Sequence, residues 1–192
     1  WLRTGNVPYD YPGPVAEDWP DLVSVVRSRV KPEREKSVAN PMAKRRAIYW
    51  WKYGSPAKDL YAAIANQEFV LVNASQAASQ FAFAQVSSRS VFSSNLNVFA
   101  QFRDDLFGIL QCRVHEAWSR FFGSTIEDRL AYTLTDCFAT YPFPGQVCMN
   151  VAQRGAEYAS YRRELMVQAD EGLTKTYNRF HDPDERSFGI LR

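Results

Sequence analysis

Residues 118–144 are the stretch that most limits how this chain can fold, because they contain Gly123 near their start and Pro142 and Pro144 at their end. An apolar helical pattern enters the stretch and is stopped by Gly123, because glycine commonly follows the last turn of a helix. Residues 130–135 then have the composition of a strand. Pro142 and Pro144 end the sheet region, because proline cannot donate to a strand ladder. The stretch therefore predicts a helix, a short loop and a strand in that order.

The loop inside this stretch carries three charged side chains, Glu127, Asp128 and Arg129. An acid and a base two residues apart suit hydrogen bonding to an edge with fixed donors and acceptors, such as a base pair in a DNA groove. Charged triplets are also common in solvated turns. The spacing alone leaves both interpretations open.

Charge is distributed unevenly along the chain. Residues 27–58 contain ten lysine or arginine residues against two acids, a local net charge of +8, whereas the whole chain of 192 residues carries +2. Such a segment can neutralise DNA phosphates and release their counterions, which gives binding that is independent of base sequence. A solvated helix face with a flexible linker is the alternative.

Basic and aromatic residues are interleaved at the end of this segment. We assign the adjacent Trp50 and Trp51 to the core, because large aromatic side chains contribute most when they are buried. We expect the basic residues beside them to contact the DNA backbone. These cations are Lys44, Arg45, Arg46 and Lys52.

Three segments have strand character, 68–73, 80–86 and 96–101, and the second alternates with period two. Antiparallel pairing is expected. Arg89 stands among three serines just after the second segment, which makes it a further candidate for contact with a base; a simple turn is the alternative.

Helical spacing is expected from Asp21 onward, over residues 58–65, and from Gln146 or Asn150 to about Glu171, where Gly172 closes the helix. On this last helix Arg154, Arg162 and Arg163 are expected to face the backbone of DNA or another domain. Another helix follows Asp105, with one inward apolar stripe formed by Leu106, Ile109, Leu110, Val114, Ala117, Trp118 and Phe121. Residues 174–182 are expected to form a loop. The sequence therefore predicts an α+β fold with a small antiparallel or mixed sheet flanked by helices and a helical C-terminal part.

Few groups suit catalysis or metal binding. The three cysteines form no Cys-x-x-Cys motif, and His115-Glu116 lacks a second histidine one turn later, where Ser119 stands. We interpret His115 as a packed helix histidine. No apolar run approaches the length of a membrane span and no signal peptide opens the chain, so a cytoplasmic protein with no membrane partner is expected.

Several weak motifs follow one another in a fixed order. They are LQCRVHEAW at 110–118, GS at 123–124, LAYT at 130–133, CFATYPFP at 137–144 and GLTKTYNRFHDP at 172–183. In order and spacing they resemble the target-recognition domain of single-chain type IIG restriction-modification enzymes of the MmeI-like group. In those enzymes an adenine-specific DNA methyltransferase carries its own DNA-reading domain.

The resemblance implies that Glu127 and Arg129 contact one base pair of double-stranded DNA. Glutamate accepts from the amino group of cytosine and arginine donates to guanine, so a C·G pair is expected. Leu130 and Ala131 stand where some members of the family have more polar residues, which leaves the alignment of the loop open. Ser124 joins the four cations named above as an expected contact to the DNA backbone.

The resemblance also implies three segments. Residues 1–44 are a lead-in and basic helix that connect to an upstream methyltransferase domain, residues 45–144 are the target-recognition domain, and residues 145–192 are a C-terminal helix and loop. The chain, which opens with Trp1, is expected to be a non-catalytic piece of a DNA methyltransferase, possessing no cofactor of its own. The complete protein would use S-adenosylmethionine, serve phage defence and, in some versions, cleave DNA.

The Asn40-Pro41 pair is interpreted as a turn, because Met42 follows where the adenine-methyltransferase motif has a second proline. The alternative function is a protein-docking module that uses Trp50, Trp51 and the long helix.

Overall fold

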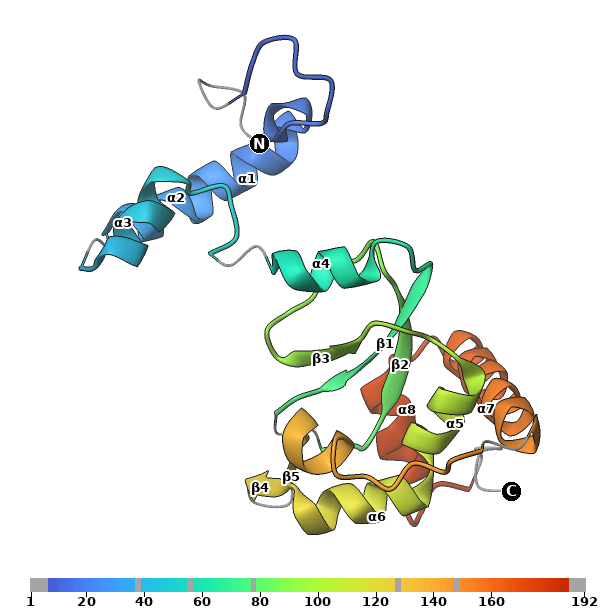
Figure 1. The fold of residues 1–192 in the computed structure, drawn as a ribbon. Helices are drawn as coiled ribbons and strands as arrows, with labels where there is room; N and C mark the ends of the chain where they lie inside the picture. The colour runs from blue at the N-terminus through green and yellow to red at the C-terminus, as the bar shows by residue number, and fades with distance from the viewer. Residues whose placement is uncertain are drawn as a thin grey trace. The chain divides into compact units, whose positions relative to one another are not determined.

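The computed structural model describes residues 7–36, 39–54, 57–76, 79–126, 129–146 and 149–186 (Figure 1). The chain forms two compact units, Trp1–Asp59 and Leu60–Arg192, called unit 1 and unit 2 below. This division does not follow the three segments expected from the sequence, whose functional assignment stays a prediction. No helix in the described ranges is both long and apolar enough to cross a membrane.

The regular elements of unit 1 that the structure describes are all helices. A short 3-10 turn, Ala16–Asp18, precedes α1 (Pro20–Arg29), α2 (Lys31–Lys36) and α3 (Pro41–Ile48). The Asn40 side chain accepts a hydrogen bond of 2.8 Å from the Ala43 amide, and Pro41 occupies the first position of α3. Both residues favour a helix start. The Asn40-Pro41 pair therefore begins a helix, where the sequence had suggested only a turn.

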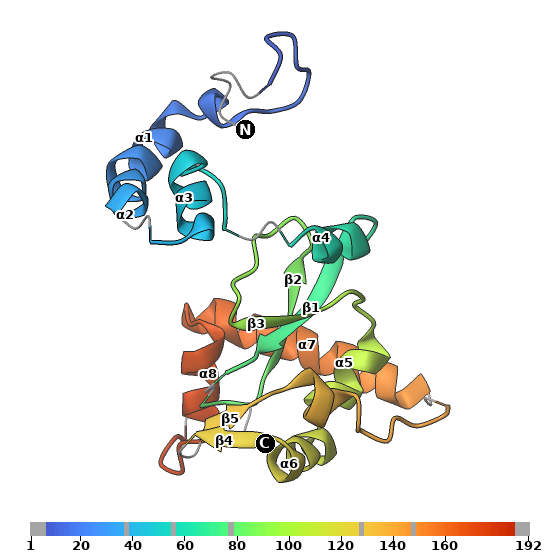
Figure 2. The same ribbon diagram turned by 60° about the vertical axis from the view of Figure 1, so that its left-hand side comes forward.

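Unit 2 is built on a three-stranded antiparallel sheet, which confirms the expected α+β class and pairing. The central strand β1 (Phe69–Ala74) lies between β2 (Phe83–Ser87) and β3 (Leu96–Phe99) (Figure 2). In the register of the sheet, Val72 stands opposite Ala84 on β2 and Val98 on β3.

Side chains alternate between the two faces of this sheet, and each face packs into a hydrophobic cluster. Val70 and Val72 point to one face and pack with Ile64 of α4 (Lys58–Ile64). Leu71 and Phe83 point to the other face and belong to the larger core. That core also contains Phe81, Phe99, Phe107, Leu110, Leu130, Tyr132 and Cys137.

The helix expected after Asp105 is broken into two. Cys112 is extended, with ψ of 158°, and separates α5 (Asp104–Gln111) from α6 (Arg113–Phe122). The break changes which residues of the second half face inward. The predicted continuous stripe is therefore wrong beyond Leu110.

The inward residues of α6 are polar. His115 and Ser119 are fully buried, whereas Val114 is 69% exposed and Phe121 is 81% exposed. Helix α6 thus turns an apolar stripe to solvent, opposite to the ordinary amphipathic arrangement.

The long helix α7 (Met149–Ala169) crosses α5 with the two backbones almost in contact. A Cβ atom on Gly155 would overlap the Asp104 carbonyl oxygen, and one on Gly108 would lie 2.9 Å from the Val151 carbonyl oxygen. Only glycine allows this approach. Arg162, two turns beyond Gly155, is buried. The expectation that Arg162 faces DNA or another domain is therefore wrong.

Residues 174–182 are mostly helical, which corrects the expected loop. Helix α8 (Leu173–Phe180) begins at its N-cap, Gly172, and buries Thr176 and Tyr177. Helix α7 already ends at Ala169, and Asp170 after it adopts a positive φ of 51°. Gly172 therefore starts a helix, although the sequence suggested that it closes one.

We predict that Gly155→Ala lowers the free energy of unfolding by about 1–3 kcal/mol, because the added methyl group meets backbone that cannot move aside. Gly145→Ala is the matched control, since a Cβ at Gly145 meets no atom within 4 Å. Urea unfolding of both variants checks this. Equal stabilities would contradict a close crossing of α5 and α7.

Candidate nucleic-acid interface

Strands β4 (Ser124–Ile126) and β5 (Arg129–Ala131) form a separate two-stranded antiparallel ribbon after α6 (Figure 2). Ile126 stands opposite Arg129, so two residues connect the strands. Those two, Glu127 and Asp128, lie outside the described residues, and the role assigned to Glu127 stays a prediction.

Alternation along β5 presents one side chain and anchors the next. Arg129 is exposed, and Leu130 is 4% exposed and belongs to the large core. Ser124, at the start of β4, is exposed as well. The ribbon therefore carries two of the predicted DNA-contacting residues, Ser124 and Arg129, at the surface of unit 2.

A buried hydrogen bond holds the base of the ribbon. The Leu110 carbonyl oxygen can only accept, so the His115 Nδ1 atom, 2.8 Å away, donates to it. His115 Nε2 is then the acceptor for the Tyr132 hydroxyl, at 3.1 Å. Burial raises the pKa of Tyr132, so this hydroxyl keeps its proton. The prediction that His115 is a packed histidine agrees with this environment.

Aromatic rings enclose the imidazole. The ring of Tyr141 lies 4.6 Å from that of His115 between centroids, and the rings of Phe81, Phe83 and Tyr132 lie at 5.6, 5.9 and 5.7 Å. Burial lowers the pKa of His115, and the backbone hydrogen bond with Leu110 offsets only part of that effect. The imidazole is accordingly neutral near neutral pH.

An amide side chain ties Tyr132, the residue directly after β5, to the central sheet. Asn97 Nδ2 on β3 donates to the Tyr132 carbonyl oxygen at 2.9 Å and to Asn73 Oδ1 on β1 at 3.1 Å. Asn73 itself is buried. The end of the ribbon is therefore fixed to both the sheet and α6.

Gly123 lets the ribbon approach the end of α6. A Cβ atom there would lie 2.5 Å from the Ser119 carbonyl oxygen, 2.8 Å from the Cys137 sulfur and 3.0 Å from a Leu130 methyl group. The predicted end of the helix at Gly123 is confirmed. The following strand is shorter than expected, because a π-helical turn, Leu134–Phe138, replaces its second half.

The other predicted base contact lies elsewhere on unit 2. Arg89 is exposed in the turn after Ser87, which pairs with Phe69 at the start of β1. Leu130 of the ribbon instead borders Asn73 at the opposite end of β1. The structure therefore does not bring Arg89 and Arg129 together.

The predicted backbone contacts Lys44, Arg45 and Arg46 are exposed on α3 of unit 1. Lys52 is half-buried, with its Nζ atom 4.9 Å from the centre of the Tyr49 ring and 5.9 Å from that of Trp51. A cation over an aromatic face is held in place.

Other cations of the basic segment stabilise unit 1. Arg34 Nη1 donates to the Trp50 carbonyl oxygen at 2.9 Å and to the Lys52 carbonyl oxygen at 2.5 Å. Arg27 and Lys31 lie over the buried Trp50 ring, at 5.9 and 5.7 Å from its centre. Burial of Trp50 agrees with its assignment to the core.

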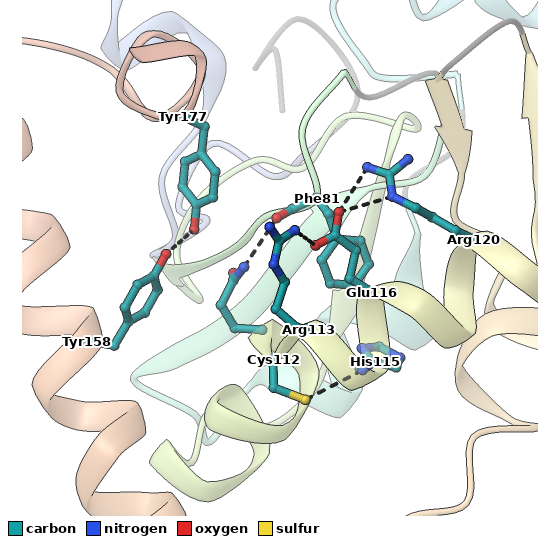
Figure 3. A network of polar contacts seen from close by, with 9 residues as sticks. Phe81, Cys112, Arg113, His115, Glu116, Arg120, Tyr158 and Tyr177 are labelled. Atoms are coloured by element: carbon teal, nitrogen blue, oxygen red, sulfur yellow. Dashed lines mark hydrogen bonds and ion pairs between the residues drawn. The ribbon is translucent and has the colours of Figure 1, made fainter. Parts of the chain in front are cut away.

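Sequence reasoning missed a polar cluster around Arg162. Its guanidinium contacts Tyr177 and Gln111. The Tyr158 and Tyr177 hydroxyls lie 2.6 Å apart, and Figure 3 shows these two side chains pointing toward each other. The available signal was the spacing of Gly155 and Arg162, seven residues apart on one helix face.

In Figure 3, Glu116 of α6 lies between Arg113 and Arg120, which donate to it at 2.8 and 3.0 Å. Burial alone would raise the pKa of Glu116, but these two hydrogen bonds lower it on balance. Within the described ranges no group of histidine, cysteine and acidic residues is arranged to hold a metal ion.

Comparison with protein-family models, curated proteins and solved structures finds no match to this chain.

We predict that the free energy of unfolding of unit 2 decreases as the pH is lowered below about 6.5, the ordinary pKa of histidine. The unfolded chain then takes up a proton that buried His115 refuses, which costs up to about 1.4 kcal/mol per pH unit. Above that pH both states are neutral at this residue and the contribution is flat.

The free energy of unfolding of the wild type and of two single variants, measured at several pH values, checks this prediction. His115→Gln should lose the dependence, whereas the matched control His181→Gln should keep it. Loss of the dependence in the His181 variant instead would contradict the assignment to His115.

Proposed function

We propose that this chain is a sequence-specific double-stranded DNA recognition module of a DNA adenine methyltransferase or restriction-modification enzyme. The observation that carries the proposal is the β4–β5 ribbon, which places Arg129 and Ser124 at the surface and is anchored through Leu130 in the core. A two-stranded ribbon fits the major groove of B-form DNA, where every base pair presents a distinct pattern of donors and acceptors.

Anchoring matters for this function because readout needs a side chain held at a fixed position. Tyr132, directly after β5, is hydrogen-bonded through its side chain to His115 and through its carbonyl oxygen to Asn97. Arg129 is three residues from this anchor. Its guanidinium would donate to guanine, and Glu127 would accept from the paired cytosine, as the family resemblance implies.

Affinity in this proposal comes from the phosphate backbone. Lys44, Arg45 and Arg46 project from one short helix of unit 1, where their exposure leaves them accessible to phosphates. Such contacts position the protein but carry little sequence information.

The chemistry would belong to another part of the enzyme. Methyl transfer from S-adenosylmethionine to an adenine amino group requires the base to leave the stack. The role proposed for this chain is the choice of which adenine is presented.

The apolar outward stripe of α6, with Val114 and Phe121, supports a second candidate, a protein-docking module. Exposed apolar side chains gathered on one face are typical of interaction surfaces. Docking through such a stripe depends weakly on salt, whereas phosphate binding depends on it strongly.

We predict that exchanging the charges, with Glu127→Lys and Arg129→Asp together, changes the preferred base pair at one position while most affinity is kept. A good bidentate contact discriminates by about 1–3 kcal/mol, so the preference at that position should shift by roughly tenfold or more. Selection from randomised duplexes, by wild type and the double variant, measures this.

Sequencing of methylated adenines in cells that express a complete methyltransferase containing this chain extends the test to function. Absence of any sequence preference in the wild type would remove base reading from the proposal. Loss of all binding in the double variant, with no new preference, would count against the ribbon.

We predict that replacing Lys44, Arg45 and Arg46 with alanine weakens DNA binding on every sequence alike. Each lost phosphate contact reduces the slope of log affinity against log salt by about 0.9, so the three together reduce it by nearly three. Lys175→Ala is the control, because Lys175 is exposed on α8 of unit 2 and pairs with Glu171. Unchanged slopes in the triple variant would favour the docking alternative.

A further inference from the structure

Unit 2 contains a cavity of about 650 Å³ beside α5, α7 and α8. This volume lies in the range of small-molecule sites. Its walls are largely aromatic and include Phe81, Phe107, Tyr141, Tyr158, Tyr177 and Phe180. Neither the ribbon strands nor the basic helices of unit 1 line it.

A buried positive charge stands behind this wall. Arg162 is only 7% exposed, and its guanidinium lies 5.2 Å from the Phe107 ring centre, 5.5 Å from that of Tyr158 and 5.9 Å from that of Tyr177. Its Nη1 atom is 3.5 Å from Gln111 Oε1. All four neighbours also line the cavity.

The Arg162 charge has no acidic partner within the described part of the chain. Its contacts there are a tyrosine hydroxyl, an amide oxygen and aromatic faces. Buried charges in proteins are ordinarily paired, because removing an ion from water is costly. The site is therefore suited to a negative charge that the described residues do not supply.

The two tyrosines give that charge a route into the cavity. Arginine can only donate, so Tyr177 accepts from Arg162 Nη1 at 3.0 Å. The hydroxyls of Tyr158 and Tyr177 lie 2.6 Å apart and share one of their two protons (Figure 3). The other proton has no acceptor in the described structure. Burial raises the pKa of Tyr158, so this hydroxyl stays protonated.

We propose that the cavity binds a small aromatic anion whose acidic group accepts the remaining proton of the Tyr158–Tyr177 pair. The guanidinium polarises both hydroxyls, so this donor is strengthened toward an anion. The aromatic walls bury the flat body of the ligand. Arg113, Arg154 and Glu116 also line the cavity, but Arg113 pairs with Glu116 and Arg154 with Glu157, so the preference for an anion comes from Arg162 and the tyrosine pair. This inference is independent of the proposed DNA recognition.

The probe for the test is anilinonaphthalene sulfonate, an aromatic anion that fluoresces in apolar surroundings. N-phenylnaphthylamine, which has similar rings and no charge, is the neutral comparison. We expect saturable binding of the anion at one site. Tyr158→Phe and Tyr177→Phe should each weaken it by about tenfold, because a hydrogen bond to a charged group is lost. Affinity for the neutral probe should stay within about twofold.

Tyr161→Phe is the matched control, because Tyr161 lies on the same helix, next to Arg162, and does not line the cavity. It should leave both affinities unchanged. Phe121→Ser tests the outward stripe of α6 as another place for the probe, since Phe121 is exposed and outside the cavity.

Three results would overturn the proposal: no saturable binding of the anion to folded protein, equal losses for the anion and the neutral probe, or loss of binding in the Phe121 variant alone. Urea unfolding of each variant shows that the protein tested is folded. The Tyr158→Phe variant is expected to fold, because it removes only the hydroxyl oxygen and keeps the ring that packs near Phe107.

Discussion

The hydrogen bond between His115 and Tyr132 is the interaction on which the arrangement of unit 2 depends. It joins α6 to the residue directly after β5 of the ribbon, inside a shell of aromatic rings. A buried imidazole with an unused nitrogen would be costly, so its two hydrogen bonds fix the orientation of α6 and the position of the ribbon together. Structural and proposed functional roles thus meet at one neutral histidine.

The contact between α5 and α7 has a similar organising effect on the rest of unit 2. Gly108 and Gly155 bring the two backbones together, and Arg162 then enters the interior two turns further along α7. Gly108 and Gly155 themselves line the cavity, beside aromatic side chains of α5, α7 and α8. The crossing of the two helices therefore forms part of the cavity wall.

Local patterns predicted much of this fold. Strand-like composition, with alternation in the second segment, placed β1 to β3, and the end of α6 at Gly123 followed from a single glycine. What the sequence could not reveal depends on packing. The break between α5 and α6 comes from the extended backbone of Cys112, which no proline or glycine in the sequence indicates. It leaves Val114 and Phe121 facing outward.

The predicted binding residues fared similarly. Exposure of Arg129 and of the three cations on α3 follows from residue type. The separation of Arg89 from Arg129 could not be predicted without the sheet register. Arg89 follows β2 and Arg129 begins β5, so their distance depends on which ends of the strands lie side by side. Arg162 resembles its exposed neighbours in sequence and differs only in the helix face it occupies.

The polar inward face of α6 also bears on how the chain reaches this structure. During collapse, a half-turn rotation of α6 would bury Val114 and Phe121 and gain apolar contact. That competing arrangement would withdraw His115 from Leu110 and Tyr132 and leave all three polar groups without their partners. The orientation of α6 therefore depends on the balance between burial of its apolar side chains and the hydrogen bonds of His115. The native orientation satisfies these three polar groups at the expense of apolar side chains that stay exposed.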